Sequence, residues 1–274
     1  MDFHEKTVVI TGGATGIGFA LARQLGNLGA WIILFEPRED RLAEATQSLA
    51  GEGIDAKYLC GDVTKVDDVE ALADFAWAEN GRCDLLINNA GIGGAMKSVI
   101  KTDPADARRI FEVNFWGMWT GISVFGKRFM AEEKPAAIYS VASENSLFNA
   151  FPFGGGGYVA SKHAIFGLMD VLRREAPEWL TTGVIIPGWV KSEISEFNAT
   201  APDAMDTDEF AKIIVGQMQA GAYYCVSHSY NMVRFRERYD ELEQAFAQYA
   251  PRHEGDDCSD VQLAVQRMRE SGQI

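Results

Sequence analysis

The stretch TGGATGIG, residues 11–18, follows the apolar run TVVIT (7–11) and opens a segment with helical periodicity. Gly12 permits a tight turn, Gly16 lets backbone N–H groups approach a phosphate, and Gly18 lets the following helix pack close to a sheet. A helix N-terminus attracts anions because its first N–H groups have no partner within the helix. The pattern therefore predicts a dinucleotide-binding turn, and a structural turn without a ligand is the alternative.

Outward from this turn, short apolar runs alternate with longer amphipathic ones. Because the short runs are apolar on both faces, we expect them to be strands that helices cover on both sides. The alternation predicts an α/β fold, a doubly wound parallel sheet of about seven strands in a single domain over residues 1–274. The expected strands are residues 7–11, 31–36, 56–62, 84–88, 136–142, 183–187 and 222–227.

The composition is that of an ordinary globular protein, with 274 residues of which 47% are hydrophobic. The net charge of −14 argues against nucleic-acid binding, which needs clustered cations. No signal peptide is visible at the start MDFHEKTVVIT, and no apolar run approaches the roughly 18 residues of a membrane span. Four widely spaced cysteines without a CxxC pair predict free thiols in the cytoplasm and no metal site.

Glu36 ends the second expected strand, about 20 residues beyond the glycine turn. A carboxylate there can accept hydrogen bonds from the adenosine ribose hydroxyls, and it repels a 2′-phosphate. The sequence therefore favours NAD over NADP. Arg38 keeps NADP open, because a guanidinium can hold a phosphate.

Further motifs follow in order along the chain. They are GDVT (61–64), NNAG (88–91), VNFWG (113–117), YSVASENS (139–146), YVASK (158–162) and PGWVKS (187–192). Together with the glycine turn, they resemble the short-chain dehydrogenase/reductase family over about residues 6–192. The resemblance implies a Rossmann-type fold, an NAD(P)-dependent alcohol dehydrogenase or reductase, and a homo-oligomer, dimeric or tetrameric.

Site residues carry over from the same motifs. The resemblance implies four catalytic residues: Asn114, Ser143, Tyr158 and Lys162. It implies cofactor contacts from both of the last two and from Gly12, Thr15, Gly16, Ile17, Gly18, Glu36, Asp62, Val63, Asn89, Ala90, Gly91, Pro187, Gly188, Val190 and Ser192. Three departures stand out: Glu36 replaces the usual Asp, Ser192 replaces the usual Thr, and the loop between Ser143 and Tyr158 is longer than usual.

Tyr158 and Lys162 stand at i and i+4 and so share one helix face, a pair that is otherwise often only a solvated surface. An unperturbed tyrosine titrates near ~10, too high for efficient proton transfer at neutral pH. A cation ~4 Å away would lower that pKa by an amount worth several kcal/mol. We therefore expect Lys162 to activate Tyr158 as general acid and base, and the glycine run 154–157 to form a flexible entrance to their helix.

The substrate side is rich in aromatic residues. Phe148, Phe151 and Phe153 follow Ser143, Trp189 lies in the PGWVKS motif, and Phe197 lies in an expected substrate loop at about 192–208. We expect Ser143, Phe148, Phe153, Tyr158 and Trp189 to contact the substrate, although about half of the aromatic residues are expected to fill core. A bulky hydrophobic secondary alcohol, aromatic or alicyclic, and its ketone are the expected substrates.

The C-terminal extension, about residues 231–274, carries apolar residues at helical spacing. The segment from residue 221 to residue 250 also resembles, more weakly, the C-terminal part of bacterial dehydrogenases that oxidise aryl carbinols. Two alternatives to an NAD-dependent dehydrogenase stay open at this point. One is an NADPH-dependent biosynthetic ketoreductase, and the other is a dinucleotide-binding sensor without turnover.

Overall fold

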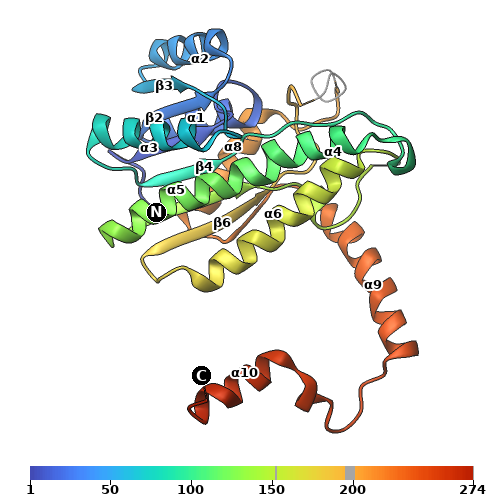
Figure 1. The fold of residues 1–274 in the computed structure, drawn as a ribbon. Helices are drawn as coiled ribbons and strands as arrows, with labels where there is room; N and C mark the ends of the chain where they lie inside the picture. Colours follow the sequence, from blue (N-terminus) through green and yellow to red (C-terminus); the bar gives the residue numbers. More distant parts are fainter. Residues whose placement is uncertain (152, 195–200, 274) are drawn as a thin grey trace. The chain divides into compact units, whose positions relative to one another are not determined.

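A computed structural model of the protein describes residues 1–151, 153–194 and 201–273. The seven strands form one parallel sheet in the order β3-β2-β1-β4-β5-β6-β7 (Figure 1). Their bounds are Thr7–Thr11 (β1), Trp31–Glu36 (β2), Ala56–Cys60 (β3), Leu85–Asn88 (β4), Ala136–Val141 (β5), Leu180–Ile186 (β6) and Tyr224–Val226 (β7). The doubly wound sheet predicted from the sequence is confirmed.

Strand limits differ most at β6, which begins at Leu180 rather than at residue 183. Thr181 and Thr182 are β-branched and favour a strand, and they pair with Ala137 and Ile138 of β5. The prediction began at Gly183 because it followed the apolar run alone and passed over these two threonines.

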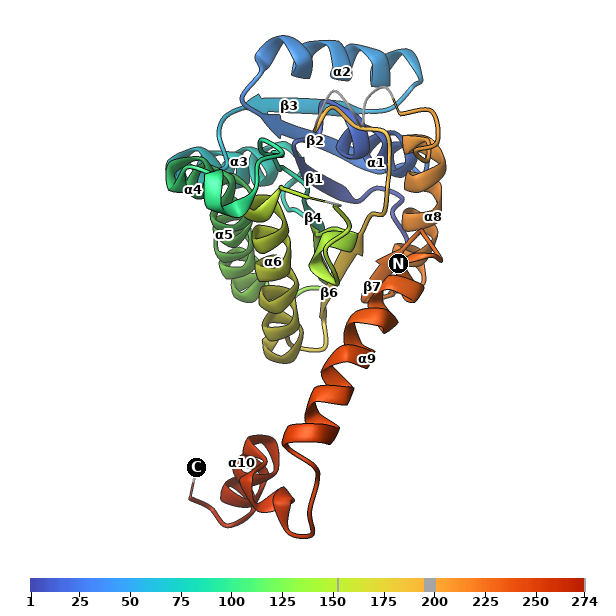
Figure 2. The same ribbon diagram turned by 90° about the vertical axis from the view of Figure 1, so that its right-hand side faces the viewer.

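Helices cover both faces of the sheet (Figure 2). Side chains of α1 (Gly16–Gly26), α2 (Glu39–Gly51) and α8 (Thr207–Gln219) join one core cluster, which includes Leu21, Leu42 and Phe210. The opposite face carries α3 (Val66–Asn80), α5 (Met118–Glu132) and α6 (Gly156–Glu175). The strand runs are apolar on both faces because each face lies under a helical layer.

A π-helical turn, η2 (Glu112–Gly117), joins α4 (Pro104–Phe111) to α5. The chain enters α4 through Asp103, whose side chain accepts a hydrogen bond from Ala105 N (2.8 Å), with Pro104 in the first turn. Short 3₁₀ turns lie at Val99–Lys101 (η1) and Glu144–Ser146 (η3).

The chain divides into two compact units, Met1–His228 and Ser229–Ile274. The first holds the whole sheet. The second holds α9 (Asn231–Tyr249), a 3₁₀ turn, η4 (Asp256–Ser259), and α10 (Val261–Glu270). The domain limits given above stay predictions. Of the expected substrate loop, residues 195–200, with Phe197, lie outside the described residues, and its last residues already belong to α8.

Candidate active site

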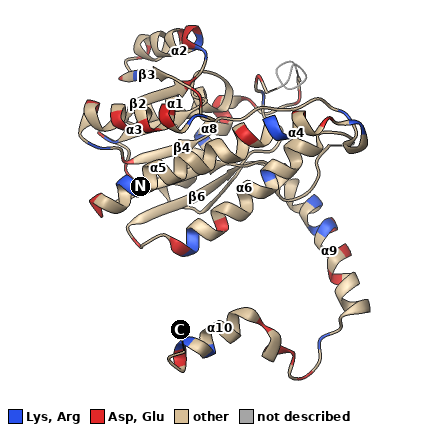
Figure 3. Ribbon diagram, viewed as in Figure 1, with Lys and Arg blue, Asp and Glu red and all other residues tan. Residues whose placement is uncertain are grey.

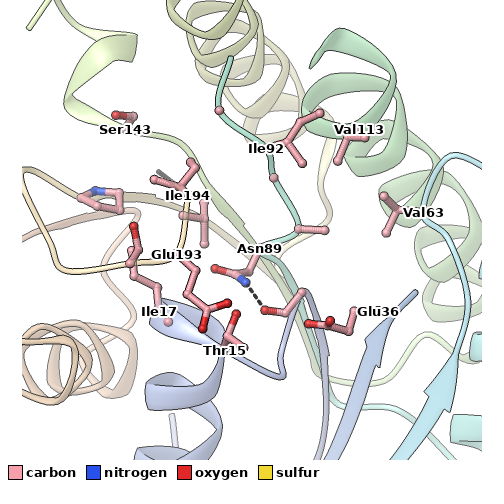
Figure 4. Close-up of a pocket in the computed structure, with 18 of the residues that line it drawn as sticks. Thr15, Ile17, Glu36, Val63, Asn89, Ile92, Val113, Ser143, Glu193 and Ile194 are labelled. Atoms are coloured by element: carbon pink, nitrogen blue, oxygen red, sulfur yellow. Dashed lines mark hydrogen bonds between the residues drawn. The ribbon is translucent and has the colours of Figure 1, made fainter. Parts of the chain in front are cut away.

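The glycine turn stands at the carboxyl ends of β1 and β4, where the strand order reverses. Gly12 and Gly16 have φ values of +61° and +54°, in the left-handed region that favours glycine. A Cβ at Gly18 would lie 2.2 Å from Gly12 O, so no other residue fits there without a shift. Asn89 Nδ2 fixes the turn by donating to Gly12 O (2.8 Å; Figure 4).

A cavity of about 540 Å³ opens over this turn. Of the predicted cofactor contacts, all except Gly18 line it, and Ser143 lines it as well. Glu36 and Ser143 lie at opposite ends of the pocket (Figure 4). The cavity has the glycine-rich N-terminus of α1 along it, a buried carboxylate at one end and a tyrosine–lysine pair at the other. This arrangement fits an extended dinucleotide.

Glu36 at the end of β2 is buried, with 4% of its surface exposed. Arg38 Nε donates to Glu36 Oε1 (2.6 Å), and the same guanidinium lies 3.4 Å from both Thr15 Oγ1 and Glu193 Oε2. From the sequence, Arg38 was a possible phosphate ligand. Its contacts with Glu36 and Glu193 could not be predicted, because the position of Glu193 depends on the fold. The hydrogen bond from Arg38 to Glu36 is the main cause that raises the pKa of Arg38.

Tyr158 and Lys162 lie one turn apart near the start of α6, as predicted. Lys162 is buried, its Nζ donates to Val141 O (2.9 Å) and lies 5.6 Å from the centre of the Tyr158 ring. Part of the Tyr158 surface is exposed, but its hydroxyl lies deep, and this burial raises the pKa of Tyr158 to about 12. A hydrogen bond with Ser143 lowers the pKa and the charge of Glu144 raises it.

The expectation that Lys162 lowers the pKa of Tyr158 is therefore wrong for the chain by itself. Burial acts on both groups and disfavours the charged form of each. It lowers the pKa of Lys162 to about 8, and no contribution from Lys162 offsets the desolvation of the tyrosine. The sequence argument counted the attraction between the two charges and left out the cost of burying them.

Ser143 lies at the end of β5 and is the N-cap of η3. Its Oγ accepts hydrogen bonds from Asn145 N (3.2 Å) and from Asn145 Nδ2 (3.4 Å). Because Asn145 contributes only donors here, the hydroxyl proton of Ser143 can point toward Tyr158 or toward a substrate oxygen.

Asn114 lies in the π-helical turn and is fully buried, and it does not line the cavity. Its Oδ1 accepts from Ile92 N (2.8 Å), and its Nδ2 donates to Ile92 O (3.0 Å) and to Ser161 Oγ (3.1 Å). The Asn114 amide thus ties the segment after β4 to α6 and positions the wall of the pocket. Its catalytic role stays a prediction.

The three predicted aromatic substrate contacts, Phe148, Phe153 and Trp189, are not among the residues that line the cavity. Phe148 is buried, whereas Phe153 is 66% exposed. Phe151 packs against Tyr158, with the two ring centres 6.0 Å apart. The sequence prediction chose Phe148 and Phe153 as substrate contacts and left out Phe151, because the spacing of the three phenylalanines does not show which of them turns toward the tyrosine.

The glycine run also differs from expectation. Gly154 and Gly155 have φ values of +74° and +71°. A Cβ on Gly154 would lie 2.8 Å from the backbone carbon of Met96, and one on Gly155 would lie 2.6 Å from the Phe151 ring. These glycines allow a left-handed backbone and close packing beside the site, so flexibility is not needed to explain them.

Residues 6–203 match the sequence family described as short chain dehydrogenase. The chain belongs to this family. One relative, the 1-deoxy-11-beta-hydroxypentalenate dehydrogenase of Streptomyces avermitilis, is 29% identical over 251 residues, which are 88% of this chain and 92% of the relative. The family makes the chain an NAD(P)-dependent oxidoreductase of the alcohol dehydrogenase and reductase class, and so favours the enzyme over the sensor.

Two solved structures extend the likeness to the fold. A short-chain dehydrogenase from Burkholderia phymatum in complex with NAD has a TM-score of 0.82 at 25% identity and covers 92% of this chain and 98% of its own. The apo form of LigD from Sphingobium sp. strain SYK-6 has a TM-score of 0.81 at 25% identity and covers 92% of this chain and 100% of its own.

No helix among the described residues is long and apolar enough to cross a membrane. They also contain no group of three or more His, Cys, Asp or Glu side chains that could hold a metal ion.

Proposed function

We propose that the protein interconverts a bulky hydrophobic secondary alcohol and its ketone, with NAD as cofactor and Tyr158 as general acid and base. The observation that supports this most strongly is the meeting of Tyr158, Ser143 and Lys162 at one end of the cavity, opposite Glu36. The family fixes the reaction class, whereas the cofactor preference, the roles of these residues and the substrate are our inference.

The cofactor would lie along the cavity. The N–H groups at the start of α1 would hold its pyrophosphate, Glu36 its adenosine ribose, and Lys162 its nicotinamide ribose. When bound, the nicotinamide supplies the hydride chemistry. The Nζ of Lys162 then has two acceptors within reach, the ribose hydroxyls and Val141 O.

The proton passes through the Tyr158 hydroxyl. In alcohol oxidation, the phenolate oxygen takes the proton of the substrate hydroxyl, and in ketone reduction the phenol gives it back. The hydroxyl of Ser143 donates a hydrogen bond to the substrate oxygen, because Asn145 already donates two hydrogen bonds to Ser143 Oγ. With the cofactor bound, the cationic form of Lys162, whose Nζ lies 5.6 Å from the ring centre, would oppose the desolvation that raises the pKa of Tyr158 in the chain by itself.

NAD is preferred because the Glu36 carboxylate accepts from ribose hydroxyls and repels a 2′-phosphate. One observation favours the second candidate, an NADPH-dependent ketoreductase. Arg38 lies at the same rim and is exposed on its outer side, so it could turn from Glu36 to a phosphate.

Apolar side chains support a hydrophobic substrate. Ile92, Val113 and Ile194 line the cavity, and Phe151 faces Tyr158. Among the described lining residues, Arg38 and Lys162 are the cationic ones. Arg38 lies at the adenosine end, and Lys162 is assigned to the cofactor, so a carboxylate or phosphate on the substrate has no evident partner near Tyr158.

Location and assembly are part of the proposal. All four cysteines are free thiols, which supports a reducing cytoplasm. We also propose a homo-oligomer, a dimer or a tetramer, as the family resemblance implies.

The test measures kcat/KM with NAD and with NADP on 1-arylalkanols, cyclic alcohols, sugars and 3-hydroxyacyl thioesters. We expect the highest values with NAD and with an aryl or cyclic alcohol. Tyr158→Phe should lower turnover by roughly 10²–10⁴ while NAD binding, followed by calorimetry, is retained. Near-normal turnover in Tyr158→Phe would refute the assigned role, and highest efficiency with sugars or thioesters would refute the substrate class.

A further inference from the structure

Helix α9 carries a single apolar stripe along its whole length. The spacing of its members alternates between three and four residues, which is the a/d pattern of a coiled coil. Phe235 and Tyr239 contact each other within the stripe, with ring centres 4.3 Å apart. The stripe consists of Met232, Phe235, Tyr239, Leu242, Phe246 and Tyr249.

The stripe has no cover within its own unit. Among the described residues 229–273, Asn231 is the buried one, and the side chains of Tyr239, Leu242 and Phe246 are 51%, 48% and 66% exposed. A stripe of this kind on a helix without a core of its own is typical of a surface that packs against another helix.

Charge divides α9 into two halves (Figure 3). The first half carries Arg234, Arg236 and Arg238 against one acid, Glu237, which pairs with Arg234 (2.9 Å). The second half carries Asp240, Glu241 and Glu243 and no base. In a parallel pair the basic halves would lie side by side and so would the acidic halves, with Arg238 beside the partner's Glu243 as a flanking contact of opposite charge. An antiparallel pair brings the whole basic half of each helix against the acidic half of the other.

We propose that α9 pairs in antiparallel fashion with α9 of a second copy of this chain. Both stripes then lie in register over their whole length, with Met232 opposite the partner's Tyr249, Phe235 opposite the partner's Phe246, and Tyr239 opposite the partner's Leu242. Arg236 and Glu243 both occupy e positions, which flank the apolar layers and face each other in an antiparallel pair. No residue of the stripe is among those that line the cavity, and the proposal does not depend on the substrate or cofactor.

Spin-label distances test the pairing in the full-length protein. The background carries Cys60→Ser and Cys258→Ser, because both thiols are exposed, and one label at a time is placed at Asp240→Cys or Gln248→Cys. With helix axes about 10 Å apart and a rise of about 1.5 Å per residue, the backbone separation is about 10 Å at residue 240 and about 24 Å at residue 248. Short distances at both positions would mean a parallel pair, and no distance between chains would mean that another surface covers the stripe; either result overturns the proposal.

Charge exchange gives a second, independent readout. Arg236→Glu and Glu243→Arg each place like charges opposite each other, so each should abolish the short distance at residue 240 at low salt. The double variant restores opposite charges and should restore that distance. Val261→Asp, which places a new charge at an exposed apolar position on α10, serves as the control and should leave the distances unchanged. Failure of the double variant to recover would overturn the antiparallel register even if the chain stays dimeric.

Discussion

Replacing Glu36 with glutamine tests the proposed NAD preference. The carboxylate is buried and lies 2.6 Å from Arg38 Nε. Two unit charges about 4 Å apart interact by about 4 kcal/mol at an effective dielectric constant of about 20, and a 2′-phosphate would lie about that close to Glu36. Arg38 neutralises part of the repulsion. If it removes about half, about 2 kcal/mol remains, which corresponds to a factor of roughly 30.

We therefore expect Glu36→Gln to raise the ratio of kcat/KM for NADP to that for NAD by roughly 30-fold. Glutamine keeps the shape of the side chain, so it still fills the end of β2. Arg38 also loses its charged partner and becomes available to the phosphate. The assay follows the absorbance of the reduced cofactor with one alcohol and both cofactors.

Glu39→Gln is the matched control, because it removes an exposed carboxylate from the first turn of α2, close in sequence to the same rim. The cofactor ratio should not change in this variant. If the ratio is also unchanged in Glu36→Gln, the carboxylate does not set the preference and the reasoning is refuted.

Three further predictions concern the tyrosine end of the site. Besides burial, the charge of Glu144 raises the pKa of Tyr158. Glu144→Gln should therefore shift the pH profile of alcohol oxidation to lower pH, and a profile that does not move would contradict a role of this charge. Burial lowers the pKa of Lys162 from 10.5 to about 8. Between these values the unfolded chain binds more protons than the folded one, so stability rises with pH. Lys162→Met should remove that rise. The measurement is the free energy of unfolding by urea at a pH below and a pH above this range, for the parent and for the variant. Asn114→Ala leaves the partly buried Ile92 N–H and C=O and the buried Ser161 Oγ without their partner and should lower the free energy of unfolding by about 2–3 kcal/mol, whereas Asn27→Ala at an exposed position should have no such effect.

Sequence reasoning succeeded where the physical signal is local. The strand runs are apolar on both faces, so the sheet could be predicted. The turn requires glycine at positions 12, 16 and 18 for steric reasons, so the dinucleotide end of the pocket could be predicted as well. Motif spacing placed Tyr158 and Lys162 together on one helix face.

What the sequence could not give depends on contacts between distant segments. Arg38 and Glu193 are 155 residues apart in the chain and meet only because β2 and β6 end at the same edge of the sheet. The raised pKa of Tyr158 depends on how deeply the fold buries its hydroxyl, and no residue near it in sequence reveals that depth. Likewise, the turn that brings Phe151 rather than Phe153 to Tyr158 is a property of the backbone of the glycine run.

The π-helical turn between α4 and α5 also limits how the gene can change. A π turn holds one residue more than an α-helical turn of the same span, and each residue of a helix advances the following side chains by about 100° around the axis. Deleting one codon within Glu112–Gly117 would relax this segment to an α-helix. Because the shortened turn covers the same span, Phe125 and Phe129 of α5 would stay on the sheet, and the change would fall on the turn itself, where Asn114 would rotate away from Ile92. Substitutions can accumulate on the exposed side of these helices, but we expect single-residue insertions and deletions in this turn to be eliminated by selection.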